Sequence, residues 1–163
     1  MDISTITEAF GDVSFMPPSL GVVFAAVLAA MLLVMSAFAS GSEIAFFSLS
    51  PADVDELEDE KTDTDRKIQM LREDSERTLA TILIANNFVN VTIIMLLNYV
   101  FAGIVHFGDK AYWLQFLIIT VLLTFLLLLF GEIMPKVYSR KDPLRFCRRV
   151  VSGILLSLIH ISE

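Results

Sequence analysis

Three asparagines, Asn86, Asn87 and Asn90, lie inside the apolar stretch LATILIANNFVNVTIIMLL, where a helix would be surrounded by lipid. At about 100° per residue, Asn86 and Asn90 share one helix face and Asn87 lies on its flank. Lipid offers no hydrogen-bonding partner, so each amide must bond a neighbouring helix or bind something polar. The residues themselves leave both alternatives open: hydrogen bonds that join helices, or ligands for an ion.

Two other apolar stretches carry oxygen-bearing side chains where they become polar. An ionisable residue at the membrane boundary is costly unless it is paired or solvated, and it therefore marks a candidate functional site. Simpler roles stay open for both acids, because Glu132 could pair with Lys136 four residues later and Glu43 could mark where the first helix meets water. The candidates are Ser36, Ser40, Ser42 and Glu43 in SAFASGSE, and Glu132 in FGEIMPK.

Hydroxyl, carboxamide and carboxylate groups, with backbone carbonyls near Gly41, form an all-oxygen set of potential ligands. Such ligands select hard cations such as Mg²⁺, Ca²⁺ or Na⁺ over zinc or copper. The single cysteine, Cys147, and the two distant histidines, His106 and His160, have no spacing typical of a metal site. The sequence therefore favours a hard cation bound by oxygen atoms.

The composition is that of an integral membrane protein: 55% of the 163 residues are hydrophobic and the mean hydropathy is +0.69. Three segments, residues 20–39, 79–105 and 113–130, have the roughly 18 or more apolar residues needed to cross about 30 Å of hydrocarbon. Residues 1–19 lack the basic region of a signal peptide, so we expect an uncleaved, extracytoplasmic N-terminal segment.

The elements around these spans follow from charge and from helix-capping signals. Lysine and arginine concentrate in residues 61–77 and 136–149, which predicts that the N-terminus lies outside and the C-terminus in the cytosol. Basic and apolar residues alternate over residues 137–158, which predicts a juxtamembrane amphipathic helix. The predicted fold class is an all-α membrane protein with three transmembrane helices plus this juxtamembrane helix.

Three shorter segments carry local signals. Ser50, Pro51 and Asp53 have the pattern of an N-cap, a first-turn proline and a first-turn acid, which predicts an acidic surface helix. Gly41 predicts a break at the end of the first span. Residues 157–163 resemble translated sequencing-adaptor DNA, and we expect them to be a non-native tail.

The segments SGSEIAFFSLSPADVDELE, TLATILIANNFVNVTIIML and FGEIMPK resemble the transmembrane domain of the CorC/cyclin M (CNNM) family of magnesium transport proteins. The resemblance covers residues 20–151 and implies a homodimer that binds a largely dehydrated Mg²⁺ in a polar cavity open to the cytosol. In that family a nucleotide-binding CBS module follows in the cytosol, and these 163 residues do not contain it. The ligands implied by the resemblance are Ser40, Asn86, Asn90 and Glu132, with Ser42, Glu43, Asn87, Pro135 and Lys136 as secondary candidates.

The expected function is Mg²⁺ transport, as Na⁺-coupled Mg²⁺ efflux, by a multi-pass protein of the bacterial inner membrane. Its expected partners are the lipid bilayer and a second copy of the chain, and we expect neither enzymatic activity nor nucleic-acid binding. The composition also resembles the gliding-motility-associated branch of the family in bacteroidetes. The alternative is a non-transporting scaffold or accessory subunit of a gliding or secretion machinery, in which the asparagines only join helices.

Overall fold

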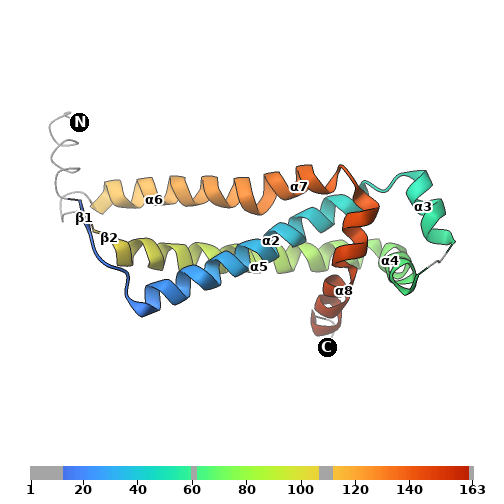
Figure 1. The fold of residues 1–163 in the computed structure, drawn as a ribbon, viewed down its shortest axis with the longest axis horizontal. Coiled ribbons are helices and arrows are strands. Elements are labelled where there is room, and N and C mark those ends of the chain that lie inside the picture. Colours follow the sequence, from blue (N-terminus) through green and yellow to red (C-terminus); the bar gives the residue numbers. More distant parts are fainter. Residues whose placement is uncertain (1–12, 60–61, 107–111, 162–163) are drawn as a thin grey trace.

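Three long helical segments run along the molecule, and shorter helices gather at one end (Figure 1). The computed structural model describes residues 13–59, 62–106 and 112–161. The first two long segments are α2 (Leu20–Phe47) and α5 (Ser75–Ile104). The third consists of α6 (Tyr112–Leu126), the π-helix η2 (Leu127–Ile133) and α7 (Met134–Ser139). The shorter helices are α3 (Pro51–Glu58), α4 (Asp63–Glu73) and α8 (Pro143–Ile161).

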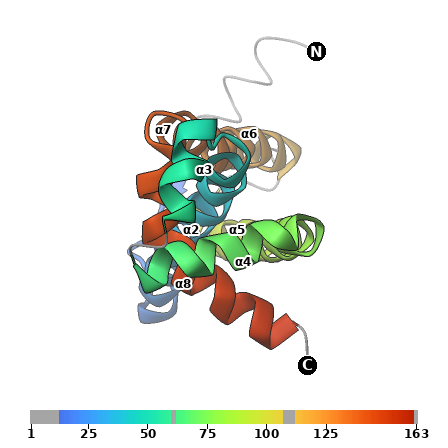
Figure 2. The same ribbon diagram turned by 90° about the vertical axis from the view of Figure 1, so that its right-hand side faces the viewer.

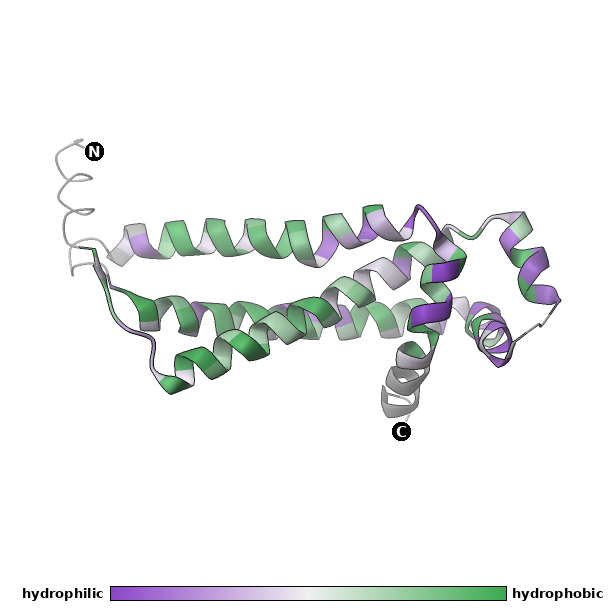
Figure 3. Cartoon of the chain, in the orientation of Figure 1, coloured by the Kyte–Doolittle hydropathy of each residue, from purple (hydrophilic) through white to green (hydrophobic). Residues whose placement is uncertain are grey.

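The long segments are apolar enough to cross a membrane. Within the described residues, the segments with sufficient length and hydropathy are Leu20–Phe47, Ser75–Ile104 and Gln115–Ser139. Hydrophobic residues cover most of their length, whereas hydrophilic residues gather on α3, α4 and the start of α8 (Figure 3). The predicted fold class is thus confirmed, with α8 as the amphipathic helix. Residues 137–139, which we expected in that helix, belong to α7.

The helices α2 and α5 pack against each other through a stripe of small side chains on α2. The stripe consists of two pairs with a spacing of four residues, Ala25 with Ala29 and Ser36 with Ser40. All four side chains are buried. No hydrophobic force joins helices inside lipid, so close approach and interhelical hydrogen bonds must do so. Far from α8, the short strands β1 (Ser14–Phe15) and β2 (Val105–His106) pair antiparallel and tie the start of α2 to the end of α5.

The predicted break at Gly41 is wrong, because α2 continues through this residue to Phe47. Gly41 instead permits a close helix contact: a Cβ placed there would lie 2.5 Å from the ring of Phe146 on α8. The same ring packs against Phe38, with 6.3 Å between the ring centroids. Small residues commonly serve this purpose in membrane helices. Gly41 therefore sets the position of α8 on α2.

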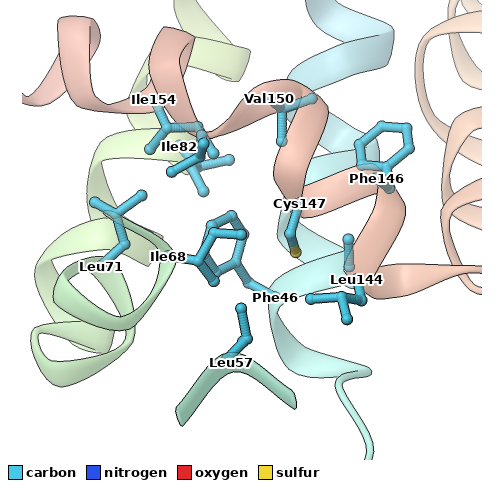
Figure 4. Close-up of a cluster of buried hydrophobic side chains, with 12 residues drawn as sticks. Phe46, Leu57, Ile68, Leu71, Ile82, Leu144, Phe146, Cys147, Val150 and Ile154 are labelled. Atoms are coloured by element: carbon cyan, nitrogen blue, oxygen red, sulfur yellow. The ribbon is translucent and has the colours of Figure 1, made fainter. Parts of the chain in front are cut away.

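The short helices α3, α4 and α8, which we call the interfacial bundle, enclose a hydrophobic core at one end of the spans. Leu57 of α3, Ile68 of α4 and Cys147 of α8 are fully buried there, beside Phe46 at the end of α2 (Figure 4). Seen from this end, α3 and α4 lie in front of the long helices, and α8 runs past α2 and α5 (Figure 2). The predicted cap of α3 is present as a capping box at Ser50.

A buried ion pair joins α4 to α8 in this bundle. The carboxylate of Asp65 is 0% exposed and accepts hydrogen bonds from Arg148 Nε at 2.7 Å and from Thr62 Oγ1 at 2.8 Å. Arg148 also donates to Glu56 at 2.9 Å. Burial alone would raise the pKa of Asp65, but the hydrogen bonds from Arg148 and Thr62 outweigh it and hold that pKa below its usual value. The ionised form of Asp65 therefore stabilises the bundle.

Replacing Asp65 with Asn should lower the free energy of unfolding at pH 7 by about 2–3 kcal/mol. This is less than the ~3–5 kcal/mol typical of a broken buried pair, because Arg148 is partly exposed and keeps Glu56 as a partner. The lowered pKa means that Asp65 contributes stability above its unfolded-state pKa of about 3.9, and that this contribution is lost as the pH falls through the lower folded-state pKa. The melting temperatures of parent and variant in detergent should therefore differ at pH 7, and the difference should shrink only below about pH 4, as the pH falls toward the folded-state pKa of Asp65.

The control for this experiment is Asp63→Asn. Asp63 is exposed and pairs at 3.2 Å with Lys67 on its own helix, an interaction worth about 0.3–0.5 kcal/mol. If both substitutions lowered the melting temperature equally, the buried pair would not be what holds α4 to α8.

Replacing Gly41 with Leu should separate α8 from α2, because the new side chain would overlap the ring of Phe146. The expected loss of stability is about 1–3 kcal/mol, as for other overpacked contacts. Gly153→Leu on α8 is the matched control, since a Cβ there meets no heavy atom within 4 Å. Thermal unfolding in detergent should show a loss for Gly41→Leu alone. A loss of the same size in both variants would contradict the close contact at Gly41.

Candidate cation site between the first two spans

Four buried polar side chains meet where α2 packs on α5: Ser36 and Ser40 from α2, and Asn86 and Asn90 from α5. Ser36 Oγ lies 2.9 Å from Asn86 Oδ1 and 2.6 Å from Asn90 Oδ1. Asn86 Nδ2 donates a hydrogen bond to Ser40 Oγ at 3.1 Å. Residues four apart lie above one another on a helix, so each helix presents its pair on one face. We call these four residues the serine–asparagine cluster.

The serine–asparagine cluster lies in the half of α2 that leads to α3, and Ser40 is three residues before Glu43. About 16 Å of helix separate Ser36 from the end of α2 at Phe47. Among the described residues, no buried side-chain nitrogen or oxygen atom lacks a hydrogen-bond partner. The cluster is therefore a polar centre enclosed by apolar helix surfaces, and its members bond to one another across the helix interface.

The oxygen atoms around Ser36 outnumber the hydrogens available to them. Ser36 has a single hydroxyl hydrogen, but the amide oxygens of Asn86 and Asn90 both lie within hydrogen-bond distance of its Oγ. Only one of the two can accept that hydrogen at a time. With both amide oxygens turned toward Ser36, as in this structure, three oxygens therefore share one proton. Converging neutral oxygens of this kind are suitable ligands for a hard cation.

The third span approaches the cluster through Gly131. A Cβ placed on Gly131 would lie 3.4 Å from Ser36 Oγ and 3.6 Å from Leu33 Cδ1. Gly131 is buried, so the absence of a side chain lets the backbone of η2 come close to α2. The serine–asparagine cluster is thus bounded by the first and second spans and touched by the backbone of the third.

Hydrogen bonding changes register in this part of the third span. The N–H of Met134 bonds the carbonyl of Leu129, five residues earlier, as in a π-helix. Pro135 follows, and proline has no N–H. The carbonyl of Phe130, five residues before Pro135, consequently receives no hydrogen bond from position 135. The turn that precedes Pro135 therefore lacks one backbone donor, close to Gly131 in the chain.

The structure unites three of the four predicted ligands. Ser40, Asn86 and Asn90 belong to the cluster, whereas Glu132 is half-buried beside Gly131 and forms no hydrogen bond or ion pair with any described residue. Ser36 connects both amides, although its sequence position marked it only as one of the oxygen-bearing residues of the first span. A signal was available, because Ser36 and Ser40 have the same four-residue spacing as Asn86 and Asn90.

Lys136 does not pair with Glu132. It pairs with Glu43 of α2 at 3.3 Å, and this ion pair joins α7 to α2. The π-helical turn and Pro135 alter the angle between positions 132 and 136, so the four-residue spacing does not align them as it would in a regular α-helix. Since both partners are partly exposed, the ion pair contributes only about 0–1 kcal/mol.

The remaining candidates lie outside the cluster. Ser42 is buried and donates to the carbonyl of Phe38 in its own helix at 2.6 Å, and Asn87 is exposed. Burial raises the pKa of the Cys147 thiol to about 12, so this group stays protonated. Within the described residues, no group of three or more His, Cys, Asp or Glu side chains could hold a metal ion. The serine–asparagine cluster is the candidate site.

Residues 27–162 match the cyclin M transmembrane N-terminal domain, a range that includes the whole cluster. The chain belongs to this family. The resemblance found in its sequence motifs is thereby confirmed for the cyclin M domain. The match also covers α3, α4 and α8, so the interfacial bundle is part of the matched cyclin M domain.

Two relatives of this cyclin M domain illustrate the similarity. Metal transporter cnnm-4 of Caenorhabditis elegans is 30% identical over 129 residues, which cover 76% of this chain and 26% of the relative. A UPF0053 protein of Haemophilus influenzae is 36% identical over 104 residues, which cover 64% of this chain and 23% of the relative. The chain therefore spans about a quarter of the length of these relatives.

Replacing Ser36 with Ala in this cyclin M domain should weaken the contact between α2 and α5. Ala removes the hydroxyl that bonds both amides and leaves buried amide oxygens without their donor, at an expected cost of about 1–2 kcal/mol. Ser42→Ala is the control, because its hydroxyl bonds only the backbone of its own helix. The measurement is thermal unfolding in detergent without added divalent cations. A larger loss of stability in Ser42→Ala than in Ser36→Ala would contradict the arrangement.

Proposed function

We propose that this cyclin M domain is the ion-binding membrane part of a divalent-cation transporter and that Mg²⁺ binds at the serine–asparagine cluster. The observation that carries this proposal is the convergence of three oxygens on one hydroxyl hydrogen at Ser36, inside an apolar span. The family match and the relative named as a metal transporter agree with it. A polar centre at this depth is costly to bury, which favours a functional role.

The proposed ligands are those expected from the sequence, with Ser36 added. Mg²⁺ bound without water needs about six oxygens at about 2.1 Å. Five side chains and one backbone carbonyl near Pro135 would provide that number. Glu132 would supply the negative charge that the amides and hydroxyls lack. Its half-buried carboxylate has no partner among the described residues and follows Gly131, which contacts the cluster. The side-chain ligands are Ser36, Ser40, Asn86, Asn90 and Glu132.

The finer proposal is Na⁺-coupled Mg²⁺ efflux across the bacterial inner membrane by a homodimer. Na⁺ is also a hard cation, so the same oxygens could hold either ion in turn. We further propose that the full-length protein carries a cytosolic CBS module. The relatives are about four times as long as their matched regions, which gives them room for such a module.

The experiment that tests this function is thermal unfolding of the detergent-purified chain with increasing MgCl₂, and with CaCl₂ and NaCl for comparison. A ligand that binds only the folded state adds about 2.7 kcal/mol of stability at a hundredfold excess over its Kd. Mg²⁺ should stabilise the parent, and Asn90→Leu and Glu132→Gln should abolish that gain. Asn98→Leu is the matched control, because Asn98 is exposed on the same helix and donates to its own backbone at Ile94.

Stabilisation by Mg²⁺ that persisted in Asn90→Leu would place the ion elsewhere. Loss of the effect in Asn98→Leu as well would show that any polar deletion in α5 disturbs binding. If NaCl reduced the stabilisation of the parent by Mg²⁺, the two ions would compete for one site, which would support Na⁺ as the coupling ion. If NaCl left that stabilisation unchanged, Na⁺ would be removed from the proposal.

A second function is a scaffold, in which the cluster only joins two helices. The observation in its favour is that the four side chains bond directly across the interface. Rotating the Asn90 amide by half a turn would present its NH₂ group to Ser36 and leave no oxygen in excess. Such interhelical bonds are worth about 0.6–2 kcal/mol each. In that case Asn90→Leu would lower stability equally with and without Mg²⁺, and no cation would protect the parent.

A further inference from the structure

An apolar groove of about 340 Å³ lies between α2, α5 and α8, on a different side of α2 from the serine–asparagine cluster. Met35, Phe38 and Ala39 of α2 and Ala85 and Val89 of α5 line it, and residues of α8 complete the lining. Met35 to Ser42 on α2 span about 10 Å along the helix axis. One leaflet of a bilayer has about 15 Å of hydrocarbon, half of the full thickness. The groove is therefore apolar enough and long enough to hold the upper part of an acyl chain.

A basic hollow of about 240 Å³ adjoins this groove on α8. Lys141, Arg145 and Arg149 line it at four-residue spacing, and all three side chains are exposed. Arg149 also lines the apolar groove, so the two spaces meet at this residue. The one acidic residue in the lining, Asp142, accepts a hydrogen bond from the backbone N–H of Arg145 at 3.1 Å. The hollow therefore carries a net positive charge at the rim of an apolar groove.

These three cations differ from their neighbour Arg148. Arg148 points into the interfacial bundle and pairs with Asp65 and Glu56. Lys141, Arg145 and Arg149 form no ion pair with any described residue. The amphipathic helix α8 thus turns Arg148 inward as a structural partner, whereas Arg145 and Arg149 of α8 and Lys141 just before it remain exposed. Three unpaired cations beside a membrane-depth apolar groove match the chemistry of an anionic lipid.

We propose that this groove and hollow form a binding site for one anionic phospholipid of the adjacent leaflet. One acyl chain lies between α2 and α5, and the phosphate contacts Lys141, Arg145 and Arg149. The site is spatially distinct from the proposed cation site, because none of the proposed cation ligands lines it. Charge complementarity and the depth of the groove favour a bilayer lipid over a free anion, which would leave the apolar part of the site empty.

Native mass spectrometry of the detergent-purified chain tests this proposal with dioleoylphosphatidylglycerol, dioleoylphosphatidylcholine and glycerol 3-phosphate. The anionic lipid should remain bound as a single adduct, more tightly than the zwitterionic lipid with identical chains, and glycerol 3-phosphate should not bind. Arg149→Glu should weaken retention of the anionic lipid by at least about tenfold. Each cation near a membrane surface is worth roughly a fivefold change in affinity, and this substitution both removes a positive charge and adds a negative one. Arg66→Glu, at an exposed position on α4, should leave it unchanged.

A second pair of variants tests the groove. Gly153 lines the groove, and a Cβ there has open space around it, so Gly153→Trp should fill the space and prevent retention of both lipids. Ser152→Trp changes the adjacent exposed residue, which does not line the groove, and should retain lipid like the parent. Should Gly153→Trp fail to fold, Arg149→Glu still decides whether the charge matters.

Three results would overturn the proposal. Equal retention of the two lipids would show that the cations do not select the headgroup. Retention of lipid by Gly153→Trp as strong as that by Ser152→Trp would show that the chain does not enter the groove. Conversion of a dimer to a monomer by Gly153→Trp, with lipid binding unchanged, would mean that the groove holds a second copy of the chain.

Discussion

Inside a bilayer, a hydroxyl or an amide finds no water, so the polar groups of α2 and α5 must be satisfied within the protein. The serine–asparagine cluster meets this requirement across the interface, and the small residues along α2 bring the two helices close enough for it. The third span approaches the same cluster where Gly131, which has no side chain, lies beside Ser36. One buried polar group of side chains thus lies where all three spans come together.

Hydropathy was sufficient to predict the spans, because an apolar run of that length has few alternatives. It failed where the outcome depended on residues far apart in the chain. Gly41 looked like a helix break, but its role is set by Phe146 on another helix. Helix α4 carries mostly polar residues, and it is joined to α8 by the buried side chain of Ile68 and by the pair between Asp65 and Arg148, 83 residues later. The register change in η2 likewise depends on packing, and Pro135 was its one local sign.

In the candidate site, too, the residue types could be predicted from the sequence, whereas the contacts between helices could not. Residue types alone indicated an all-oxygen set of ligands, and three of the four predicted ligands are in contact. Choosing among the serines of the first span required knowing which face of α2 meets α5. Ser42 bonds its own backbone, while Ser36 bridges both amides. The pairing of Lys136 with Glu43 was not foreseen either, because spacing within one helix suggested a nearer partner and the contact is between helices.

Helix α2 connects all of these features within a short length. Ser36 and Ser40 face α5, Gly41 receives α8, and Ala39 lines the groove proposed for lipid. The helix is unbroken through this region, so a displacement that admits an ion between α2 and α5 must also move the wall of the groove or strain the contact at Gly41. If both proposed ligands bind, their affinities are then coupled, and the coupling must be reciprocal: lipid changes the affinity for the cation by the same factor as the cation changes the affinity for lipid. In such an arrangement the composition of the surrounding leaflet would adjust cation binding without any contact between the lipid and the ion.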